Sequence, residues 1–256
     1  MKMKNSIPLS RVLLATAAPL VLLPAPAIHA EEALEEVVVT ATRYDRNLSD
    51  IGSSISVINT EDLETAQTVF VQDMLQSVPG LTLNQNGSFG GVSSVRIRGA
   101  SSDQTVILID GVQVNDVSTP GGGYNFANLD PNGIARIEVL RGPQSILYGS
   151  DAIGGVVNII TPGGEGGLTG SLFAEGGSFN TFRGGGHIAG GSDKLNFSLS
   201  ASGITSDGIS KADENNGNTE QDGYRNISLH GKVSGKISEN HSLQLISRYV
   251  DGSREF

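Results

Sequence analysis

Apolar and polar residues alternate through much of the second half of the chain. From Leu195 to Ser202 every odd position is apolar and every even position is Asn or Ser. The same period of two recurs, diluted by glycines, in residues 168–175 and 227–237. A period of two is typical of β-strands with one apolar and one polar face. It fits strands of a transmembrane β-barrel and an antiparallel sheet of a soluble domain equally well.

The first half has a different pattern. Residues 51–58 read as a strand, and Thr60 followed by Glu61 and Asp62 predicts a capped, acidic first turn of a helix. A second helix is predicted before Pro79-Gly80, from apolar residues at helical spacing. Those residues are Val71, Met74, Leu75 and Val78.

Further short apolar runs, separated by turn residues, predict strands. They lie at 81–83, 95–97, 106–109, 112–114 and 134–140. Helices mixed with short strands predict a small α+β domain over residues 51–164, followed by strands of a different kind over residues 165–256.

The N-terminus has the features of a secretory signal peptide. Basic residues at 2, 4 and 11 precede an apolar run at 12–23, which is shorter than the roughly 20 residues that a membrane-spanning helix needs. Cleavage is predicted after Ala27 or after Ala30, and the polar Glu31 that follows favours Ala30. Residues 1–30 are therefore predicted to direct export and to be removed.

Composition narrows the possible functions. The net charge is −10 and the basic signal residues would be lost, so binding to nucleic acid is disfavoured. The chain has no cysteine, which excludes disulfides and thiolate metal sites. Nucleophile elbow, Walker loop and His-Glu-x-x-His motifs are all missing from the sequence, so we expect no enzyme activity.

An acidic and then β-prone segment, residues 31–50, connects the signal to the α+β domain. Its apolar part, Val37 to Val39, follows Glu35-Glu36 and has no apolar partner nearby in the sequence. Two interpretations stay open: the first strand of the domain that follows, or a peptide that binds another strand.

Charged residues occur inside the otherwise apolar runs of the α+β domain. They are Arg96, Arg98, Asp110, Arg136, Glu138 and Arg141. Buried charges must be paired or hydrated, so these residues are expected to form ion pairs that fix the domain and its contact with a polar wall, ahead of a direct ligand role. Asp110-Gly111 and Gly142-Pro143 are turn dipeptides.

Several of these runs match motifs of one family. Residues 95–99 (VRIRG), 106–112 (VILIDGV), 136–143 (RIEVLRGP) and 147–161 (LYGSDAIGGVVNIIT) resemble the plug domain of TonB-dependent outer-membrane receptors, and among these the cobalamin (vitamin B12) receptors. The resemblance favours the barrel interpretation of the alternating strands. It implies an α+β plug domain followed by the first antiparallel strands of an incomplete transmembrane β-barrel.

The resemblance also implies partners and a location. A TonB box is expected at Glu36, Val37, Val38, Val39, Thr40 and Ala41, where the periplasmic energy-coupling protein TonB would bind by strand addition. The outer membrane is the expected location, with its lipid as a further partner of the full-length receptor. The family barrel has about 22 strands, whereas residues 167–256 can supply about five or six, so an N-terminal fragment is expected.

Two polar, glycine-rich stretches, 85–93 and 117–128, are the candidate ligand loops by resemblance; alternatively they are loose connections. The candidate contacts are Ser88, Phe89, Gly90, Ser118, Thr119, Tyr124 and Phe126. Cobalamin is the expected cargo, ahead of an iron siderophore. A periplasmic binding module made by the plug alone is the further alternative.

An acidic loop between two predicted strands suggests a calcium site, although no cofactor is required. Its candidate ligands are Asp207, Asp213, Glu220, Asp222 and Asp251. Carboxylate oxygens suit Ca²⁺, but EF-hand spacing is missing from the sequence, and a solvated polar loop explains the same residues.

Overall fold

The structure, a computed structural model, describes residues 38–41, 46–47, 52–87, 89–116, 118, 122–164, 166–210 and 221–255. Its N-terminal elements are β1 (Val38–Val39), β2 (Arg46–Asn47), β3 (Ser54–Asn59), α1 (Thr60–Thr65), α2 (Val71–Leu75), β4 (Leu81–Gln85), β5 (Ser93–Ile97), β6 (Thr105–Ile109), β7 (Val112–Gln113), β8 (Arg136–Arg141), α3 (Ser145–Tyr148) and β9 (Gly155–Ile160). Single 3₁₀ turns occur at Ser102–Gln104, Phe126–Asn128 and Ser150–Ala152.

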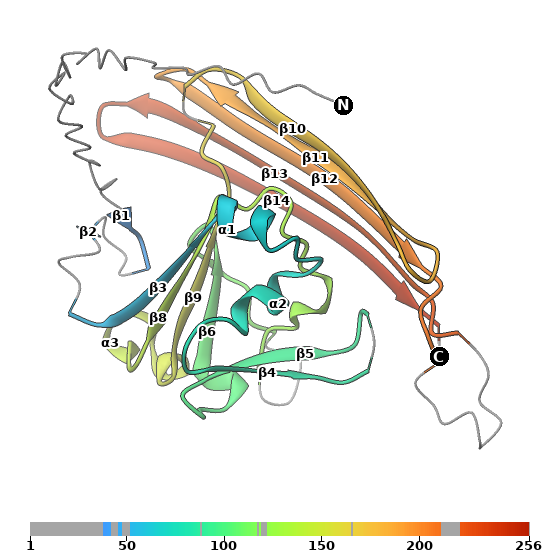
Figure 1. The fold of residues 1–256 in the computed structure, drawn as a ribbon. Coiled ribbons are helices and arrows are strands. Elements are labelled where there is room, and N and C mark those ends of the chain that lie inside the picture. The colour runs from blue at the N-terminus through green and yellow to red at the C-terminus, as the bar shows by residue number, and fades with distance from the viewer. Residues whose placement is uncertain are drawn as a thin grey trace, which may run out of the picture. The chain divides into compact units, whose positions relative to one another are not determined.

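A mixed sheet with the order β3-β8-β9-β6-β7 organises this region (Figure 1). Its neighbouring strands are antiparallel except β6 and β9, which are parallel. Asp110 and Gly111 form the two-residue turn between β6 and β7, with φ values of 48° and 81°. An Asp-Gly pair suits such a turn, because both residues need positive φ.

One face of the mixed sheet is covered by α1, α2 and the β4–β5 hairpin. Val71, Leu75 and Val78 are buried there with apolar side chains of β6, β8 and β9. The N-cap of the first helix lies one residue before the predicted Thr60, since Asn59 is the cap and its N–H donates to Asp62. The Thr60 hydroxyl instead donates to the carbonyl of Ala135 at 2.8 Å. None of the described helices is long and apolar enough to cross a membrane.

The opposite face of the mixed sheet has a second, smaller apolar cluster. Its fully or nearly buried members are Ala41, Val106, Leu108, Leu140, Ala152 and Val156. Two polar side chains of the sheet, Glu138 and Asn158, are buried on the same face at 0% and 3% exposure. They are register partners on β8 and β9. This face therefore combines an apolar cluster with a buried carboxylate.

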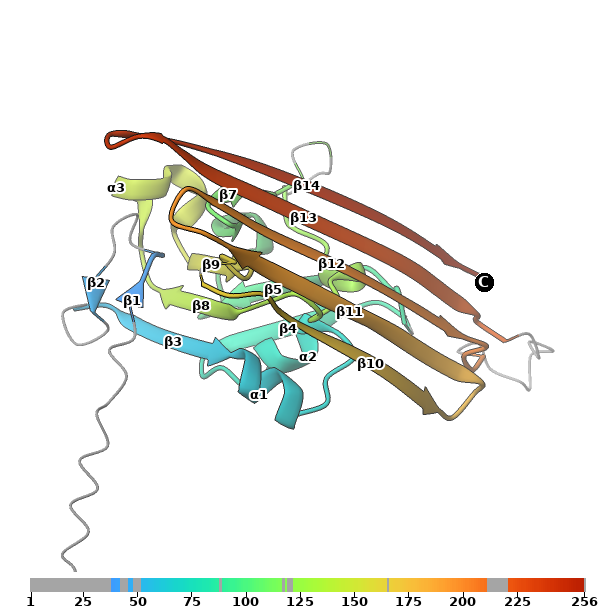
Figure 2. The ribbon, with the colours of Figure 1, turned by 90° about the horizontal axis from the view of Figure 1, so that it is seen from above.

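Five long strands form a second sheet, which we call the long sheet. It comprises β10 (Thr169–Gly177), β11 (Thr181–Gly191), β12 (Leu195–Ser206), β13 (Tyr224–Ser238) and β14 (His241–Arg254). Each strand pairs antiparallel with the next one in the sequence, and Figure 2 shows them side by side.

Along β12, the apolar side chains from position 195 to 201 are exposed, and the serines between them are buried. Leu199 is 54% exposed, whereas its neighbours Ser198 and Ser200 are 3% and 5% exposed. Leu229 and Leu245 are likewise exposed, at 43% and 68%. A soluble antiparallel sheet has the reverse arrangement, so the burial pattern separates the two interpretations that the alternation alone left open.

The buried polar face of the long sheet contacts the domain built on the mixed sheet. Arg183 of β11 forms an ion pair with Asp130 at 3.2 Å, and both side chains are less than a tenth exposed. The Asn132 side-chain amide donates to the carbonyls of Gly186 and Ala201, at 3.1 Å each. An added Cβ at Gly185 or Gly186 would collide with the neighbouring strands at Ser202 and Leu172, so the glycines allow β11 to pair closely on both sides here.

A second buried contact joins the β6–β7 turn to β13. The Asp110 carboxylate accepts hydrogen bonds from the Thr161 backbone N–H and hydroxyl, and Lys232 Nζ lies 2.9 Å from it. His230 Nε2 lies 3.6 Å from the same carboxylate. The sequence analysis expected the charged motif residues to form ion pairs and to contact a polar wall. Asp110 does so through Lys232 of the long sheet.

Lys232→Met should destabilise the chain, because it leaves the buried Asp110 carboxylate without its ammonium partner. The expected loss is about 3 kcal/mol in the free energy of unfolding, measured by denaturant titration of the purified chain in detergent. Lys236→Met on the same strand is the matched control, since Lys236 is exposed. Equal losses in both variants would contradict a specific role for the Asp110–Lys232 pair.

Candidate functional site

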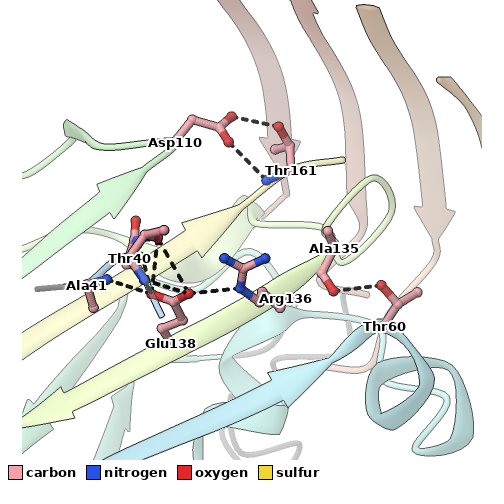
Figure 3. A network of polar contacts seen from close by, with 9 residues as sticks. Thr40, Ala41, Thr60, Asp110, Ala135, Arg136, Glu138 and Thr161 are labelled. Atoms are coloured by element: carbon pink, nitrogen blue, oxygen red, sulfur yellow. Dashed lines mark hydrogen bonds and ion pairs between the residues drawn. The ribbon is translucent and has the colours of Figure 1, made fainter. Parts of the chain in front are cut away.

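The residues at positions 40 and 41 are bound to a buried carboxylate of the mixed sheet. The backbone N–H of Thr40 lies 3.0 Å, and that of Ala41 2.7 Å, from Glu138 Oε2 (Figure 3). Two consecutive N–H groups that point at one anion form a strong, charge-assisted contact. Glu138 follows Thr40 by 98 residues, so the contact is a tertiary one.

Glu138 lies in the middle of β8, and its side chain is 0% exposed. Arg136 Nε lies 2.8 Å from Glu138 Oε1 and is its counter-ion, while 28% of the Arg136 side chain is exposed. Asn158 donates its amide to Thr40 Oγ1 at 3.1 Å and to Glu138 Oε2 at 3.4 Å. These donors offset the cost of burying the carboxylate.

The carbonyl of Ala41 is bound as well. The Tyr148 hydroxyl, at the end of α3, donates to it at 2.9 Å. The Ala41 side chain is 0% exposed and packs in the apolar cluster with Leu140 and Val156. Residues 40 and 41 thus dock through two N–H groups, one carbonyl and one methyl group. We call Glu138 and Tyr148, with the cluster around Ala41, the docking site.

The predicted TonB box is partly covered by the described residues. Glu36 and Val37 lie outside them. Val38 and Val39 form β1, which pairs antiparallel with Arg46 and Asn47 of β2. Thr40 and Ala41 occupy the docking site. The apolar segment that has no apolar partner nearby in the sequence thus pairs with a short strand directly after it.

A cavity of about 630 Å³ opens beside the docking site, between the mixed sheet and the long sheet. It is lined by Thr40, Asp110, Arg136, Tyr148, Asn158, Lys232 and Gln244, among others. Most of these side chains are polar or charged, so the cavity can hold water next to the Glu138–Arg136 pair.

The candidate ligand loops lie against the long sheet. The Phe89 ring packs against Phe70 at 5.5 Å and Tyr224 at 6.4 Å, and Arg254 donates to the carbonyl of Gly90 at 3.0 Å. Phe89 is still 36% exposed. Phe89 and Gly90 are therefore anchored to β13 and β14, and a cavity of about 210 Å³ adjoins Gly90 and Tyr224.

The second candidate loop contains one half-buried aromatic residue, Tyr124, and one buried aromatic residue, Phe126. Tyr124 accepts a hydrogen bond from Arg248 of β14 at 2.7 Å. Phe126 is 1% exposed and packs edge-on against the Tyr124 ring, so it is a core residue beneath Tyr124 and presents no surface to a ligand. Ser118 donates its N–H and hydroxyl to Asp116, which lowers the pKa of that exposed carboxyl, the hydroxyl having the larger effect. Ser88 and Thr119 lie outside the described residues.

The candidate calcium ligands are only partly described, since Asp213 and Glu220 lie outside the described residues. Asp207 accepts a hydrogen bond from Asn180 at 2.6 Å. Asp251 lies within β14, where it pairs with Ile227, and Asp222 lies just before β13. Within the part of the chain that the structure describes, no three acidic, histidine or cysteine side chains are grouped to bind a metal ion.

The docking site itself was not predicted from the sequence. Tyr148 and Asn158 belong to a motif quoted only for its resemblance, and no local pattern connects them to Thr40. The sequence did indicate that Glu138 has partners, because a carboxylate inside an apolar strand requires hydrogen-bond donors or a counter-ion. The sequence did not indicate that residues 40 and 41 provide them.

Comparisons with known proteins agree with this architecture. The family model described as the TonB-dependent Receptor Plug Domain matches residues 47–156. The vitamin B12 transporter BtuB of Photobacterium profundum is 31% identical over 252 residues, which is 97% of this chain and 41% of the relative. BtuB of Vibrio vulnificus strain CMCP6 is 40% identical over 159 residues, or 61% of this chain and 26% of the relative.

Solved structures show the same fold. The siderophore receptor PirA from Acinetobacter baumannii has a TM-score of 0.65 and 26% identity, over 79% of this chain and 32% of that one. The ferripyoverdine receptor of the outer membrane of Pseudomonas aeruginosa has a TM-score of 0.67 at 18% identity, over 84% of this chain and 27% of that one. The chain thus spans less than half the length of these proteins. Residues 47–156 form a TonB-dependent receptor plug domain, and the chain is similar to vitamin B12 transporters over 97% of its own length.

Proposed function

We propose that the chain forms the plug and adjoining wall strands of an outer-membrane receptor that takes up a large, scarce nutrient. The observation that carries this proposal is the reversed polarity of the long sheet. Apolar side chains such as Leu199 and Leu229 are exposed, while the polar side chains of Arg183 and Lys232 on the other face form ion pairs with the plug. Strands that separate lipid from a polar interior require this arrangement.

Cobalamin is the proposed cargo. The two relatives with 31% and 40% identity are both named vitamin B12 transporters. An iron siderophore is the alternative, because PirA, at 26% identity, is named a siderophore receptor. A plug that acts alone in the periplasm is disfavoured by the buried pairs Asp130–Arg183 and Asp110–Lys232, which need the long sheet.

Energy for uptake is proposed to arrive through contact between TonB and residues 36–41. The outer membrane has no nucleotide supply, so work on the plug must come from outside it. Residues Val38 and Val39 are already extended in β1, and an extended backbone can add to a partner strand through hydrogen bonds that tolerate varied side chains.

Leu229→Lys should prevent stable membrane integration. Leu229 lies at mid-strand on the exposed apolar face, between Ala201 and Tyr249, where a lysine costs about 2–4 kcal/mol in lipid. We expect at least about a tenfold smaller fraction of urea-resistant, membrane-bound chain. Glu239→Lys, in the turn between β13 and β14, is the control that adds a positive charge outside the apolar band. Unchanged integration of Leu229→Lys would contradict lipid contact on this face.

Val39→Pro should weaken binding of the purified periplasmic domain of TonB by about tenfold or more, because proline removes a strand donor and restricts the backbone. Uptake by a receptor that carries this change should be lost, while ligand binding stays intact. Val39→Ala is the matched control, since it keeps the N–H and should bind as the unmodified chain does. Equal binding by both variants in a titration would refute the assignment of residues 36–41.

Cargo can be tested by calorimetric titration of the purified chain with cyanocobalamin and, separately, with ferric enterobactin. Saturable binding of cyanocobalamin is expected, and Phe89→Ala should weaken it because the exposed edge of that ring is lost. If ferric enterobactin binds and cyanocobalamin does not, the proposed cargo is wrong and an iron siderophore is the cargo instead.

A further inference from the structure

One side chain of the long sheet contacts both candidate ligand loops. Tyr224, the first residue of β13, is 3% exposed. Its ring packs against Phe89 of the loop at 85–93, with the ring centroids 6.4 Å apart. Its hydroxyl donates to Asn128 Oδ1 at 2.8 Å, at the end of the loop at 117–128. Two loops that are separate in the sequence thus share one anchor on the wall.

The first loop lies on the ring of Tyr224. The Phe70 ring, just before α2, lies edge-on to the rings of Tyr224 and Phe89, at centroid distances of 5.8 and 5.5 Å. An added Cβ at Gly90 would collide with the Tyr224 ring, and the φ value of 74° at this position also favours glycine. The Gly90 carbonyl accepts a hydrogen bond from Arg254 at 3.0 Å. The backbone of the loop therefore rests directly against the aromatic ring.

The second loop is held by the hydroxyl of Tyr224. Asn128 is the last residue of the 3₁₀ turn Phe126–Asn128, and its side-chain oxygen accepts the Tyr224 hydroxyl. A Cβ added at Gly252 of β14 would lie 2.8 Å from Asn128 Nδ2, so the amide occupies space that the glycine leaves. Ring and hydroxyl of one side chain thus hold different loops.

A direct contact between the loops reaches only the end of the first one. Asn125 Oδ1 accepts a hydrogen bond from the Ser93 N–H at 3.0 Å, where the loop enters β5. Phe89 lies farther from β5 and contacts the wall at Tyr224. The ring of Tyr224 therefore supports a part of the loop that the Ser93 hydrogen bond does not reach.

We propose that Tyr224 is a positioning residue of the cargo site, which orders both candidate ligand loops before the cargo binds. Loops that are ordered in advance lose less conformational entropy on binding. Tyr224 is itself buried beneath Phe89 and acts through the loops. Its effect on cargo affinity rests on the proposed function. Its effect on the order of the loops does not, because it follows from contacts within the chain.

Hydrogen exchange of single backbone amides, in the purified chain in detergent, measures the two roles separately. The Asn86 N–H donates to the Val92 carbonyl at 2.9 Å and reports on the first loop. The Leu129 N–H donates to the Phe126 carbonyl at 3.1 Å and reports on the second loop. The Asp110 N–H, which is hydrogen-bonded within the mixed sheet, reports on the stability of the whole domain.

Tyr224→Phe should raise the exchange rate at Leu129 about fivefold, because one hydrogen bond is lost, and should leave the rate at Asn86 unchanged. Tyr224→Leu also removes the ring and should raise both rates about fivefold or more. Tyr249→Phe is the matched control, since it removes a hydroxyl from the exposed face of β14, and it should change neither rate.

Two results of this experiment would overturn the proposal. One is an unchanged rate at Leu129 in Tyr224→Phe. The other is an equal rise at Leu129 and Asp110, because that would mean a general loss of stability instead of a local loosening of the loop. Tyr224→Phe keeps the ring, so the test stands even if Tyr224→Leu does not fold.

Calorimetric titration with cyanocobalamin tests the consequence for the cargo. Tyr224→Phe should bind it about fivefold more weakly, with a less favourable entropy of binding, because the cargo must then order the second loop. Tyr249→Phe should bind it as the unmodified chain does. Equal affinity of Tyr224→Phe and the unmodified chain would overturn the positioning role. Faster exchange at Leu129, with no chain binding cyanocobalamin, would support the hold on the loops and refute the proposed cargo.

Discussion

Two buried carboxylates connect the mixed sheet to the rest of the chain. Asp110, at the β6–β7 turn, is paired with Lys232 of the long sheet and with Thr161. Glu138, on β8, is paired with Arg136 and with the backbone of residues 40 and 41. A carboxylate can be buried only if donors surround it. The mixed sheet therefore meets the long sheet at one carboxylate and the N-terminal segment at the other.

Both carboxylates line or adjoin the same cavity. Asp110, Arg136 and Lys232 all contribute to its lining. A charged cavity next to a docked segment lets polar contacts exchange with water, whereas an apolar interface would resist separation. The same interior thus combines specific pairing with the possibility of local release, which the proposed uptake requires of a plug.

Patterns local in the sequence predicted much of the fold. The apolar runs at 106–109 and 134–140 coincide with β6 and β8 within two residues, and Asp110-Gly111 forms the predicted turn. The first helix cap differs by one residue, because the Thr60 hydroxyl binds the Ala135 carbonyl and leaves the cap to Asn59. Tertiary contact overrode a local preference at this position.

The docking site could not be predicted, because it depends on contacts between residues 97 or more positions apart. Residue type alone also failed to predict the role of Phe126. Its aromatic ring suggested a ligand contact, but the side chain is buried in the core. Which face of the long sheet points toward the plug could not be predicted either. Alternation gives two faces, but only the position of the plug decides which one is inside.

The loop at Asn132 has a consequence for how this architecture can vary. Its amide binds main-chain carbonyls of Gly186 and Ala201 rather than side chains. Carbonyls stay in place when the side chains around them change. At this point, different inner linings, suited to different cargoes, can therefore surround one unchanged loop, provided that the strand residue against Gly133, here Ser200, stays small.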